Sequence, residues 1–303
     1  MKIAYLVLAH KNPQLLRRVI RTLSSEDCTF FIHIDQKSKI EEFSGIEEGN
    51  VVFSERRVPV YWGEFSQVQA TVLLIHQIMA RPHKYDYIVL LQGADYPIRS
   101  REYIHRFLEE NRGLEFMSIV KMPNEAAGKP ISRINTLRFP SHKPVRRFAL
   151  RVLAKLGLAQ RDYRKYLRGL EPYSGSATWG LTADACRYIL EFIERNQRVV
   201  EYFQNVFAPD ESFFHTILGN SAFRPRVRRD LVYSDWSSSQ NGHPAMISDR
   251  HVAFFEEREK VVLNDFYGPG ELLFARKFSD DSLDLLRRID DMIARKEGRR
   301  VSP

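Results

Sequence analysis

Two adjacent carboxylates, Asp210 and Glu211, are the residues of this chain whose types and position best suit acid–base chemistry. They follow Pro209 and precede the apolar run 213–218, which places them at the start of a predicted helix. A carboxylate in that position can act as a general base. It can equally serve the helix itself, because each acidic side chain near a helix N-terminus contributes about 0.3–1 kcal/mol through the helix dipole. On these residues alone, both interpretations remain open.

A segment of small residues, 173–180, precedes the acid pair and reads Tyr-Ser-Gly-Ser-Ala-Thr-Trp-Gly. Gly175 and Ser176 leave little side-chain bulk between the backbone and a ligand, and Trp179 is the one large apolar side chain near them. A helix is predicted over 183–207, and it would carry this segment and the acid pair to the same end of a sheet. We therefore expect one site to contain both.

Two cations near the C-terminus, Arg276 and Lys277, lie between aromatic residues in the run Phe-Ala-Arg-Lys-Phe over 274–278. Aromatic neighbours can fix such side chains in place. Positive charge held in this way can stabilise a departing diphosphate.

The elements that must position these groups begin with a β-α-β unit. The apolar run 2–9 predicts a buried strand, Asn12 and Pro13 predict the cap and first residue of a helix, and 29–34 predicts a second strand that ends at Asp35. Such a unit implies a parallel sheet, whose ligands bind at the carboxyl ends of the strands. Asp35 is thus placed to bond a ribose hydroxyl or a base edge, or else it forms a turn.

Neither a Gly-x-Gly-x-x-Gly sequence nor a Walker-type phosphate loop follows the first strand, which argues against a dinucleotide enzyme and a P-loop kinase. Further strands are predicted at 51–53, 58–62, 85–91, 116–120 and 230–236, and further helices at 68–79, 100–108 and 283–294. The strand 85–91 ends in Gln-Gly-Ala-Asp, so Asp95 stands alone without the Asp-x-Asp pattern of a metal-binding transferase. We expect no metal and no other cofactor, with side-chain cations neutralising the leaving group.

Composition sets the outer limits. The chain has 303 residues, 44% of them hydrophobic, enough for a sizeable core, and its formal net charge of +8 favours anionic partners. Cys28 and Cys186 are isolated thiols. No run approaches the roughly 20 apolar residues of a membrane span, so a cytoplasmic protein is expected. Nucleic acid is not expected as a partner, because no nucleic-acid-binding motif occurs.

The basic excess gathers in 138–168, which holds ten Lys or Arg residues against one Asp. Within it, 148–156 alternates apolar and basic residues at helical spacing. The stretch is either a solvated helical face or a patch that binds an anionic membrane or a phosphorylated substrate.

These features favour an α/β fold of the GT-A-like kind, with a mainly parallel central sheet flanked by helices in a single domain over 1–303. Within it we expect a nucleotide-binding half at 1–120, a basic insertion on the acceptor side at 121–172, a catalytic and acceptor half at 173–294, and a frayed tail at 295–303. A sugar-nucleotide glycosyltransferase needs a base for the acceptor hydroxyl and cations for the diphosphate, so it fits the residues found.

The chain resembles the core-2/I-branching N-acetylglucosaminyltransferases and the peptide xylosyltransferases of glycosyltransferase family 14. The resemblance rests on motifs that occur in the same order: 4–10 (AYLVLAH), 32–38 (IHIDQKS), 60–66 (VYWGEFS), 93–98 (GADYPI), 175–179 (GSATW), 209–211 (PDE), 235–236 (DW) and 273–278 (LFARKF). Each motif is weak alone, and their order carries the assignment.

The resemblance implies an inverting, metal-independent transferase that uses a UDP-sugar, with Glu211 as the general base. It implies that Asp35 binds the uridine and that Lys277 contacts the diphosphate. The other residues that match family motifs are assigned by position: to the nucleotide, His10 and Arg276; to the acceptor or the donor sugar, Trp62, Asp95, Gly175, Ser176, Trp179, Asp210 and Trp236. Asp95 has no firm role.

The chain departs from the family at the second cation on the diphosphate, because Val232 stands where some members have Arg. Arg250 is the substitute candidate, with Arg229 behind it. Animal members have a membrane anchor and many cysteines; this chain shows neither and so resembles a bacterial, cytosolic relative. The acceptor is then expected to be a glycan under assembly, with a lipid-linked glycan as one form, and 138–168 is expected in peripheral contact with the inner face of the membrane.

The sugar is not fixed by these motifs. N-acetylglucosamine is favoured, and UDP-xylose or UDP-glucuronate are alternative donors. A relative of the same fold that binds a glycan or a nucleotide without transferring a sugar is the remaining alternative.

Overall fold

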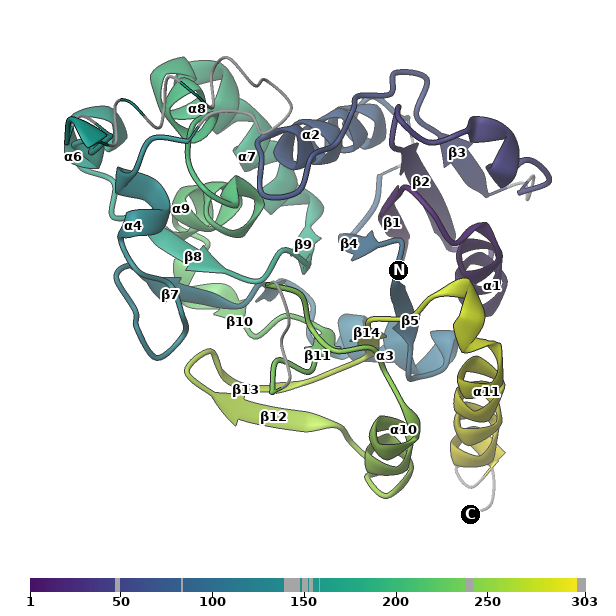
Figure 1. Cartoon of the computed structure of the whole chain (residues 1–303). Helices are drawn as coiled ribbons and strands as arrows, with labels where there is room; N and C mark the ends of the chain where they lie inside the picture. The colour runs from purple at the N-terminus through teal and green to yellow at the C-terminus, as the bar shows by residue number, and fades with distance from the viewer. Residues whose placement is uncertain are drawn as a thin grey trace.

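The computed structural model describes residues 1–298 except 47–49, 83, 139–147, 149–151, 153–154, 158 and 238–241. Its centre is a seven-stranded sheet in the order β10-β6-β9-β4-β1-β2-β3 (Figure 1). The strands of this sheet are β1 (Ile3–Ala9), β2 (Cys28–Ile34), β3 (Val51–Phe53), β4 (Tyr87–Gln92), β6 (Glu115–Phe116), β9 (Trp179–Thr182) and β10 (Val227–Arg228). The α/β class with a mainly parallel sheet flanked by helices is confirmed.

β1 lies in the middle of the parallel part, between β2 and β4, with Ile3 in register with Cys28 on one side and Tyr87 on the other. β9 runs antiparallel to β4 and β6. The carboxyl ends of β1, β2 and β4 therefore meet at one edge of the sheet, as the opening β-α-β pattern predicts.

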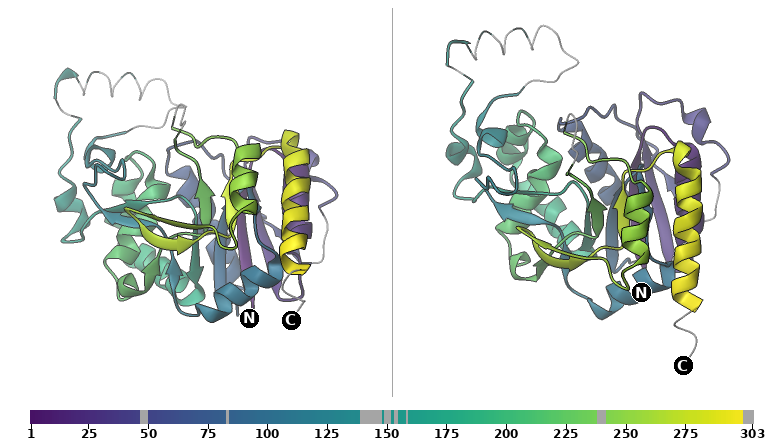
Figure 2. Two further views of the ribbon diagram at one scale, coloured as in Figure 1. Left: turned by 90° about the horizontal axis from the view of Figure 1, so that it is seen from below. Right: turned by 60° about the horizontal axis from the view of Figure 1, so that its bottom comes forward.

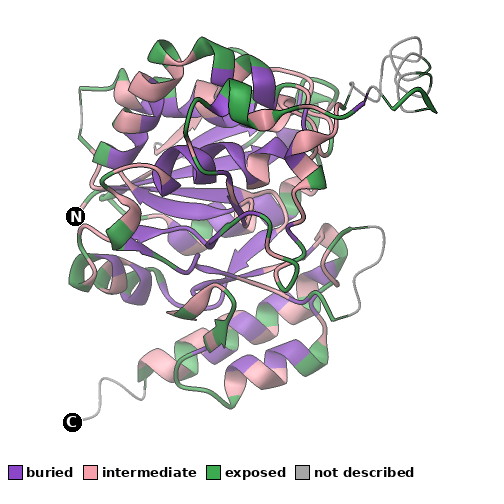
Figure 3. Cartoon of the chain, turned by 90° about the vertical axis from the view of Figure 1, so that its left-hand side faces the viewer, coloured by how far each residue is buried: buried purple, intermediate pink, exposed green. Residues whose placement is uncertain are grey.

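Helices cover both faces of the sheet (Figure 3). Alternate residues of β1 divide between two cores: Ile3, Tyr5 and Val7 pack on one face, and Ala4, Leu6 and Leu8 pack on the other. The first face is covered by α1 (Pro13–Leu23), α3 (Arg101–Glu110), α10 (Asp249–Glu256) and α11 (Leu283–Gly298). The second face is covered by α2 (Ser66–Met79), α7 (Ala183–Arg195), α8 (Gln197–Phe203) and α9 (Phe213–Gly219).

Three smaller sheets accompany the main sheet within the described part of the chain. They are a three-stranded sheet of β11 (Val232–Ser234), β14 (Phe274–Arg276) and β5 (Asp95–Pro97), the hairpin β12 (Val262–Asp265) and β13 (Gly268–Glu271), and the pair β7 (Ile119–Lys121) and β8 (Tyr173–Gly175). The turned views show α10 and α11 side by side (Figure 2). The short 3-10 helices are η1 (Ile40–Phe43), η2 (Pro209–Glu211), η3 (Arg224–Arg226) and η4 (Asp280–Ser282), and the short α-helices are α4 (Ser132–Asn135) and α6 (Tyr163–Leu167).

Some predicted elements differ from the observed ones. The helix expected over 183–207 is two helices, α7 and α8, which meet at Asn196, whose backbone leaves the helical region. The strand expected over 116–120 is split between β6 and β7, and 58–62 forms no strand. The expected edge strand in 230–236 is present as β11, which pairs only with β14 within the described residues.

The cap of α1 also differs. Asn12 is left-handed and its side chain caps nothing in the helix; instead the carboxylate of Asp280 accepts a hydrogen bond from Leu15 N at 2.8 Å. Asp290 of α11 accepts hydrogen bonds from Arg18 and from the Tyr96 hydroxyl. Asp280 and Asp290 thus tie the C-terminal segment to the N-terminal half.

The amphipathic helix expected over 148–156 lies largely outside the described residues. Within the described part of the chain, no helix is long and apolar enough to span a membrane.

Candidate active site

Glu211 ends the short turn η2, and α9 follows almost at once. Ala208, with φ of 46°, turns the chain into Pro209, so the predicted position of the acid pair at the head of an apolar helix is correct. The backbone carbonyl of Glu211 accepts a hydrogen bond of 2.6 Å from the Ser174 hydroxyl on β8. This bond fixes the acid pair against the small-residue segment, as the sequence predicts.

The carboxylate of Glu211 is held by two cations. Lys129 Nζ lies 2.5 Å and Arg133 Nη2 2.6 Å from the same oxygen, Oε2. Burial by itself raises the pKa of Glu211, but Lys129 and Arg133 outweigh it and hold that pKa below its usual range. Burial in turn lowers the pKa of Lys129. Glu211 is therefore ionised in the neutral pH range.

Asp210 has a different environment from its neighbour. Burial, followed by the charge of Glu211, raises the pKa of Asp210 to about 7. Its Oδ1 is buried and has no hydrogen-bond partner among the described residues. Burial and Glu211 thus raise the pKa of Asp210 while Lys129 and Arg133 lower that of Glu211, so the negative charge of the pair is favoured on Glu211.

Gly175 is required by packing. A Cβ there would lie 1.6 Å from the Ser118 carbonyl oxygen and 2.8 Å from Cδ2 of His215. Burial lowers the pKa of His215 to about 3, which leaves this ring neutral behind the acid pair. The glycine thus serves the contact between β7, β8 and α9, whereas the sequence interpretation was open access of a ligand to the backbone.

The residues after Gly175 face a buried carboxylate. The Thr178 hydroxyl donates to Asp230 at 3.0 Å, the Ser118 hydroxyl donates to the same group at 2.6 Å, and Ser176 bonds Thr178. Trp179 is 1% exposed and packs edge-on against Phe214. Its predicted contact with a sugar stays a prediction, and the position of its ring in the core does not support it.

Asp35 forms a turn at the end of β2. Its Oδ1 accepts from Lys37 N at 2.9 Å and from Val60 N at 3.2 Å, and its Oδ2 accepts from Lys37 Nζ at 2.6 Å. Burial raises the pKa of Asp35, but the hydrogen bonds from Lys37 and Val60 together outweigh burial, so the net shift of this pKa is downward. The turn-forming interpretation is correct, and nucleotide binding by the same side chain stays a prediction.

A cluster of cations lies next to it, at the ends of β1 and β14. Burial, followed by the charges of Lys11 and Arg276, lowers the pKa of Lys277. Burial, Lys11 and, more weakly, Lys277 lower the pKa of His10. Among the described residues no carboxylate pairs with Lys277 or Lys11, so this positive charge is open to an anionic ligand.

Arg276 is committed to Asp95. The two residues face each other in the β14–β5 pair, with Arg276 Nε 3.4 Å from Asp95 Oδ1. Asp95 is fully buried and its Oδ2 accepts from Gln92 N at 2.8 Å. Burial raises the pKa of Asp95, and Arg276 opposes that shift. Nucleotide binding by Arg276 stays a prediction, and Asp95 gains a structural partner.

Aromatic rings connect the cations to the acid pair. Trp62, 58% exposed, lies 5.4 Å from the ring of His243 and 5.7 Å from that of Phe207. Burial and then the charge of Lys277 lower the pKa of His243, so His243 lies within the electrostatic range of the cation cluster. Phe207 in turn contacts Arg133, the partner of Glu211, at 5.3 Å. The predicted Trp62 thus lies between the two charged groups.

Arg250, the substitute candidate for a second diphosphate cation, donates to Asp235 at 2.6 Å. His251 binds the same carboxylate at 2.9 Å, and together they hold the loop from which Trp236 projects, 54% exposed. The reserve candidate, Arg229, is paired with Asp265 of the β12–β13 hairpin. Neither Arg250 nor Arg229 influences the pKa of Lys277, whereas the charge of Lys11 lowers it.

Sequence reasoning missed the cations around Glu211. Lys129 and Arg133 lie in an irregular segment with no periodic signal, and they reach Glu211 only through the fold. The sequence patterns do not single out Lys11 or His243 either, although Lys11 directly follows the motif 4–10, which ends at His10. Tyr267, at the hairpin turn, has its pKa raised by burial and then by Glu211 and Asp230, so it too lies near the acid pair.

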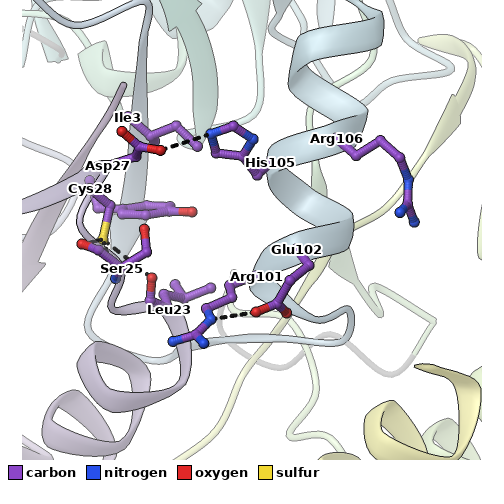
Figure 4. A pocket seen from close by; sticks show the side chains of 10 residues that line it. Ile3, Leu23, Ser25, Asp27, Cys28, Arg101, Glu102, His105 and Arg106 are labelled. Atoms are coloured by element: carbon purple, nitrogen blue, oxygen red, sulfur yellow. Dashed lines mark hydrogen bonds and ion pairs between the residues drawn. The ribbon is translucent and has the colours of Figure 1, made fainter. Parts of the chain in front are cut away.

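Two further observations bound the site. A pocket lies at the opposite, amino-terminal end of β1 and β2 (Figure 4), and its polar groups are largely paired, as Arg101 is with Glu102 and His105 with Asp27. None of the predicted site residues lines it. Among the described residues, no group of three or more His, Cys, Asp or Glu side chains could hold a metal ion.

A protein-family model described as Branch, Core-2/I-Branching enzyme, matches residues 3–259. A human beta-1,3-galactosyl-O-glycosyl-glycoprotein beta-1,6-N-acetylglucosaminyltransferase is 27% identical over 222 residues, which cover 71% of this chain and 48% of that protein. Xylosyltransferase 2 of Rattus norvegicus is 25% identical, over 78% of this chain and 27% of its own. Xylosyltransferase sqv-6 of Caenorhabditis briggsae is 24% identical, over 94% of this chain and 35% of its own. The chain thus spans half or less of these curated relatives.

Proposed function

Because this chain belongs to the Core-2/I-Branching enzyme family, we propose that it is a glycosyltransferase. It transfers a sugar from a UDP-sugar to a hydroxyl of a glycan acceptor. N-acetylglucosamine is the favoured sugar, and xylose and glucuronate are the alternatives. The similarity to an N-acetylglucosaminyltransferase and to xylosyltransferases supports the first two.

The observation that carries this proposal is a series of aromatic rings that lies between the cation cluster and the acid pair. The ring of His243, whose pKa the charge of Lys277 lowers, contacts Trp62. Trp62 contacts Phe207, and Phe207 contacts Arg133, the partner of Glu211. We propose that a donor diphosphate bound on these cations directs its anomeric carbon toward Glu211.

In the proposed inverting reaction, the acceptor oxygen attacks the anomeric carbon while Glu211 takes the hydroxyl proton. The bond from that carbon to the diphosphate oxygen breaks, and its electron pair leaves with UDP. The pairing of Glu211 with Lys129 and Arg133 supports its part in this step, because it keeps the proton-accepting form populated at neutral pH.

We propose that side-chain cations neutralise the leaving diphosphate without a metal. Lys277 and Lys11 supply this charge, and their lack of a carboxylate partner in the described part of the chain supports the assignment. Arg276 lies behind them, held by Asp95.

The acceptor is proposed to be a glycan under assembly, and a lipid-linked one would agree with an exposed apolar stripe in the basic stretch. Phe148, Val152 and Leu156 recur every four residues and are 68%, 41% and 65% exposed. Flotation with anionic liposomes tests this contact, and Phe148→Asp together with Leu156→Asp should remove it. If the double variant floats as the wild type does, the membrane contact is wrong.

A second candidate is a relative that binds its ligands without transfer. The observation in its favour is that both cations on Glu211 reduce its basicity. The two candidates differ in UDP release: with UDP-sugars and a mixed pool of glycan acceptors, a transferase releases UDP and a protein that only binds does not.

The experiment that tests the function is a thermal-shift series with UDP, UDP-N-acetylglucosamine, UDP-xylose and UDP-glucuronate, each with and without EDTA. UDP and one of the sugars should raise the melting temperature equally in both conditions, and GDP should not. Stabilisation that requires added metal would refute the metal-free step. No stabilisation by any uridine nucleotide would refute the transferase itself.

A further inference from the structure

The ring of Phe207 is where three segments meet beside Glu211. Arg133 and Arg138 lie with their guanidinium carbons 5.3 Å and 5.4 Å from the ring centre. The centre of the Trp62 ring lies 5.7 Å from that of Phe207, with the two planes at 72°. Both arginines therefore rest on the same aromatic side chain.

Backbone hydrogen bonds fix this arrangement. Phe207 N donates to the Arg133 carbonyl at 2.9 Å, and Arg138 N donates to the Asn205 carbonyl at 2.8 Å. Ala208 N donates to the Gly63 carbonyl at 3.0 Å, which holds the Trp62 loop against the same segment. The position of the two guanidinium groups thus follows from the chain path as well as from their side chains.

The charges around this ring do not balance. Lys129, Arg133 and Arg138 are three cations, and Glu211 is the ionised carboxylate that binds the first two. Asp210 beside it has its pKa raised by burial and Glu211, so it adds at most part of a second negative charge. Arg138 is exposed and has no carboxylate partner among the described residues. A guanidinium that is fixed on a ring and left without an anion is suited to bind a carboxylate or a phosphate with two parallel hydrogen bonds.

We propose that the acceptor glycan is anionic, and that its carboxylate or phosphate binds between Arg138 and Arg133 while a sugar ring lies against Trp62. This inference rests on the proposed function and adds the chemical class of the acceptor. It also gives Arg133 two partners, Glu211 and the acceptor anion. The anion offsets the positive field on Glu211, so the base becomes stronger once the acceptor is in place.

A binding experiment on the full chain saturated with UDP tests the inference. Methyl β-D-glucuronide is compared with methyl β-D-glucoside, and glucose 6-phosphate with glucose, by ligand-observed NMR titration. The first pair isolates a carboxylate and the second a phosphate, so the two arms identify the source of the charge. At least one charged sugar should bind about tenfold more tightly than its neutral counterpart, as expected for a charge-assisted contact.

Three variants locate the contact. Arg138→Ala should abolish the advantage of the charged sugar, and Arg138→Lys should keep part of it because the charge remains. Arg258→Ala removes an arginine that rests on Phe254 in the same way, at 3.9 Å, outside the site, so it should behave as the wild type does.

The outcomes separate the two proposals. Equal or absent binding of charged and neutral sugars, or an advantage that survives in Arg138→Ala, overturns the anionic acceptor. UDP binding is read in the same samples by thermal shift. If UDP binds and the charged sugars have no advantage, the inference fails while the proposed function stands; if UDP fails to bind, the proposed function fails.

Discussion

The Nζ atom of Lys129 lies 2.5 Å from Oε2 of Glu211, so the carboxylate proposed as the base carries an ion pair in the absence of substrate. The pair lowers the pKa of Glu211 against the effect of burial. Glu211 is therefore ionised over a wide pH range but is a weak base. Binding of the substrate, or of its charge, must raise the basicity of Glu211 for catalysis.

Lys129→Met should move the acid limb of the pH dependence of kcat/KM to higher pH. Loss of the lysine removes the second-largest influence on Glu211, so burial then raises the pKa of this carboxyl. The pH profile of UDP release measures the shift. Lys121→Met is the control, since Lys121 pairs with Glu171 on the surface; an acid limb that stays in place in Lys129→Met would exclude control of Glu211 by Lys129.

The same pair affects stability. The folded pKa of Glu211 lies below its unfolded value, so its contribution is present above the ordinary carboxyl pKa of about 4.3 and is lost as the pH falls through the folded value. Lys129→Met should therefore flatten the acid side of the unfolding free energy as well.

Glu211→Gln should lower the transfer rate by about 10²- to 10⁴-fold, the usual contribution of a general base, and leave UDP binding unchanged. Asp210→Asn is the matched variant. Because Asp210 is buried with a pKa of about 7, its amide should be tolerated far better in the rate. Single-turnover transfer and UDP titration give the two quantities, and near-normal transfer by Glu211→Gln would remove it from its role.

Asp95→Asn should weaken UDP binding through Arg276, although Asp95 touches no ligand in this scheme. Asp95 is buried and loses its ion-pair partnership with Arg276 in this variant, so the melting temperature should fall too. Asp290→Asn supplies the comparison, because Asp290 pairs with Arg18 on the other side of Tyr96. It should lower the melting temperature and leave UDP affinity intact; equal losses of UDP affinity in both variants would mean general destabilisation.

The sequence predicted what local patterns determine and missed what long-range contacts determine. The apolar run 3–9 and the proline before the acid pair identify β1 and η2 correctly, because strand burial and helix starts are local. The partners of Glu211 are 82 and 78 residues away in the chain, and nothing in the segment 129–133 marks them. The distinction between Asp210 and Glu211 came from the family resemblance, since both residues suit a helix start equally well.

The interpretation of Gly175 shows the same limit from the other side. A glycine signals that something lies close to the backbone, but the sequence does not say whether it is a ligand or the chain itself. Here it is the Ser118 carbonyl.

Gly175→Ala should therefore disrupt folding and not only ligand binding. A methyl group 1.6 Å from a carbonyl oxygen forces the β7–β8 pair apart, at a cost of about 3 kcal/mol or more. Urea unfolding measures the loss. Gly298→Ala is the control, because a Cβ there meets nothing within 4 Å. A stable Gly175→Ala variant that had lost only UDP or acceptor binding would favour the ligand interpretation instead.

Asp235→Asn should remove a pH-dependent part of the stability and release the Trp236 loop. Hydrogen bonds from Ser237 and His251 lower the pKa of Asp235 well below its usual range. The stabilisation is therefore complete above about pH 4, the ordinary Asp range, and is lost as the pH falls toward the folded value.

The free energy of unfolding, measured in urea from pH 2.5 to 6, should rise less steeply for this variant than for the wild type. Tryptophan fluorescence should also shift, since Arg250 and His251 no longer hold the chain next to Trp236. Asp284→Asn is the control, because that carboxylate is 93% exposed and, among the residues that the structure describes, pairs with Arg287 alone. The same slope in the wild type and in Asp235→Asn would show that the acid sensitivity arises from other carboxylates, with those at Asp35 and Glu211 the next to test.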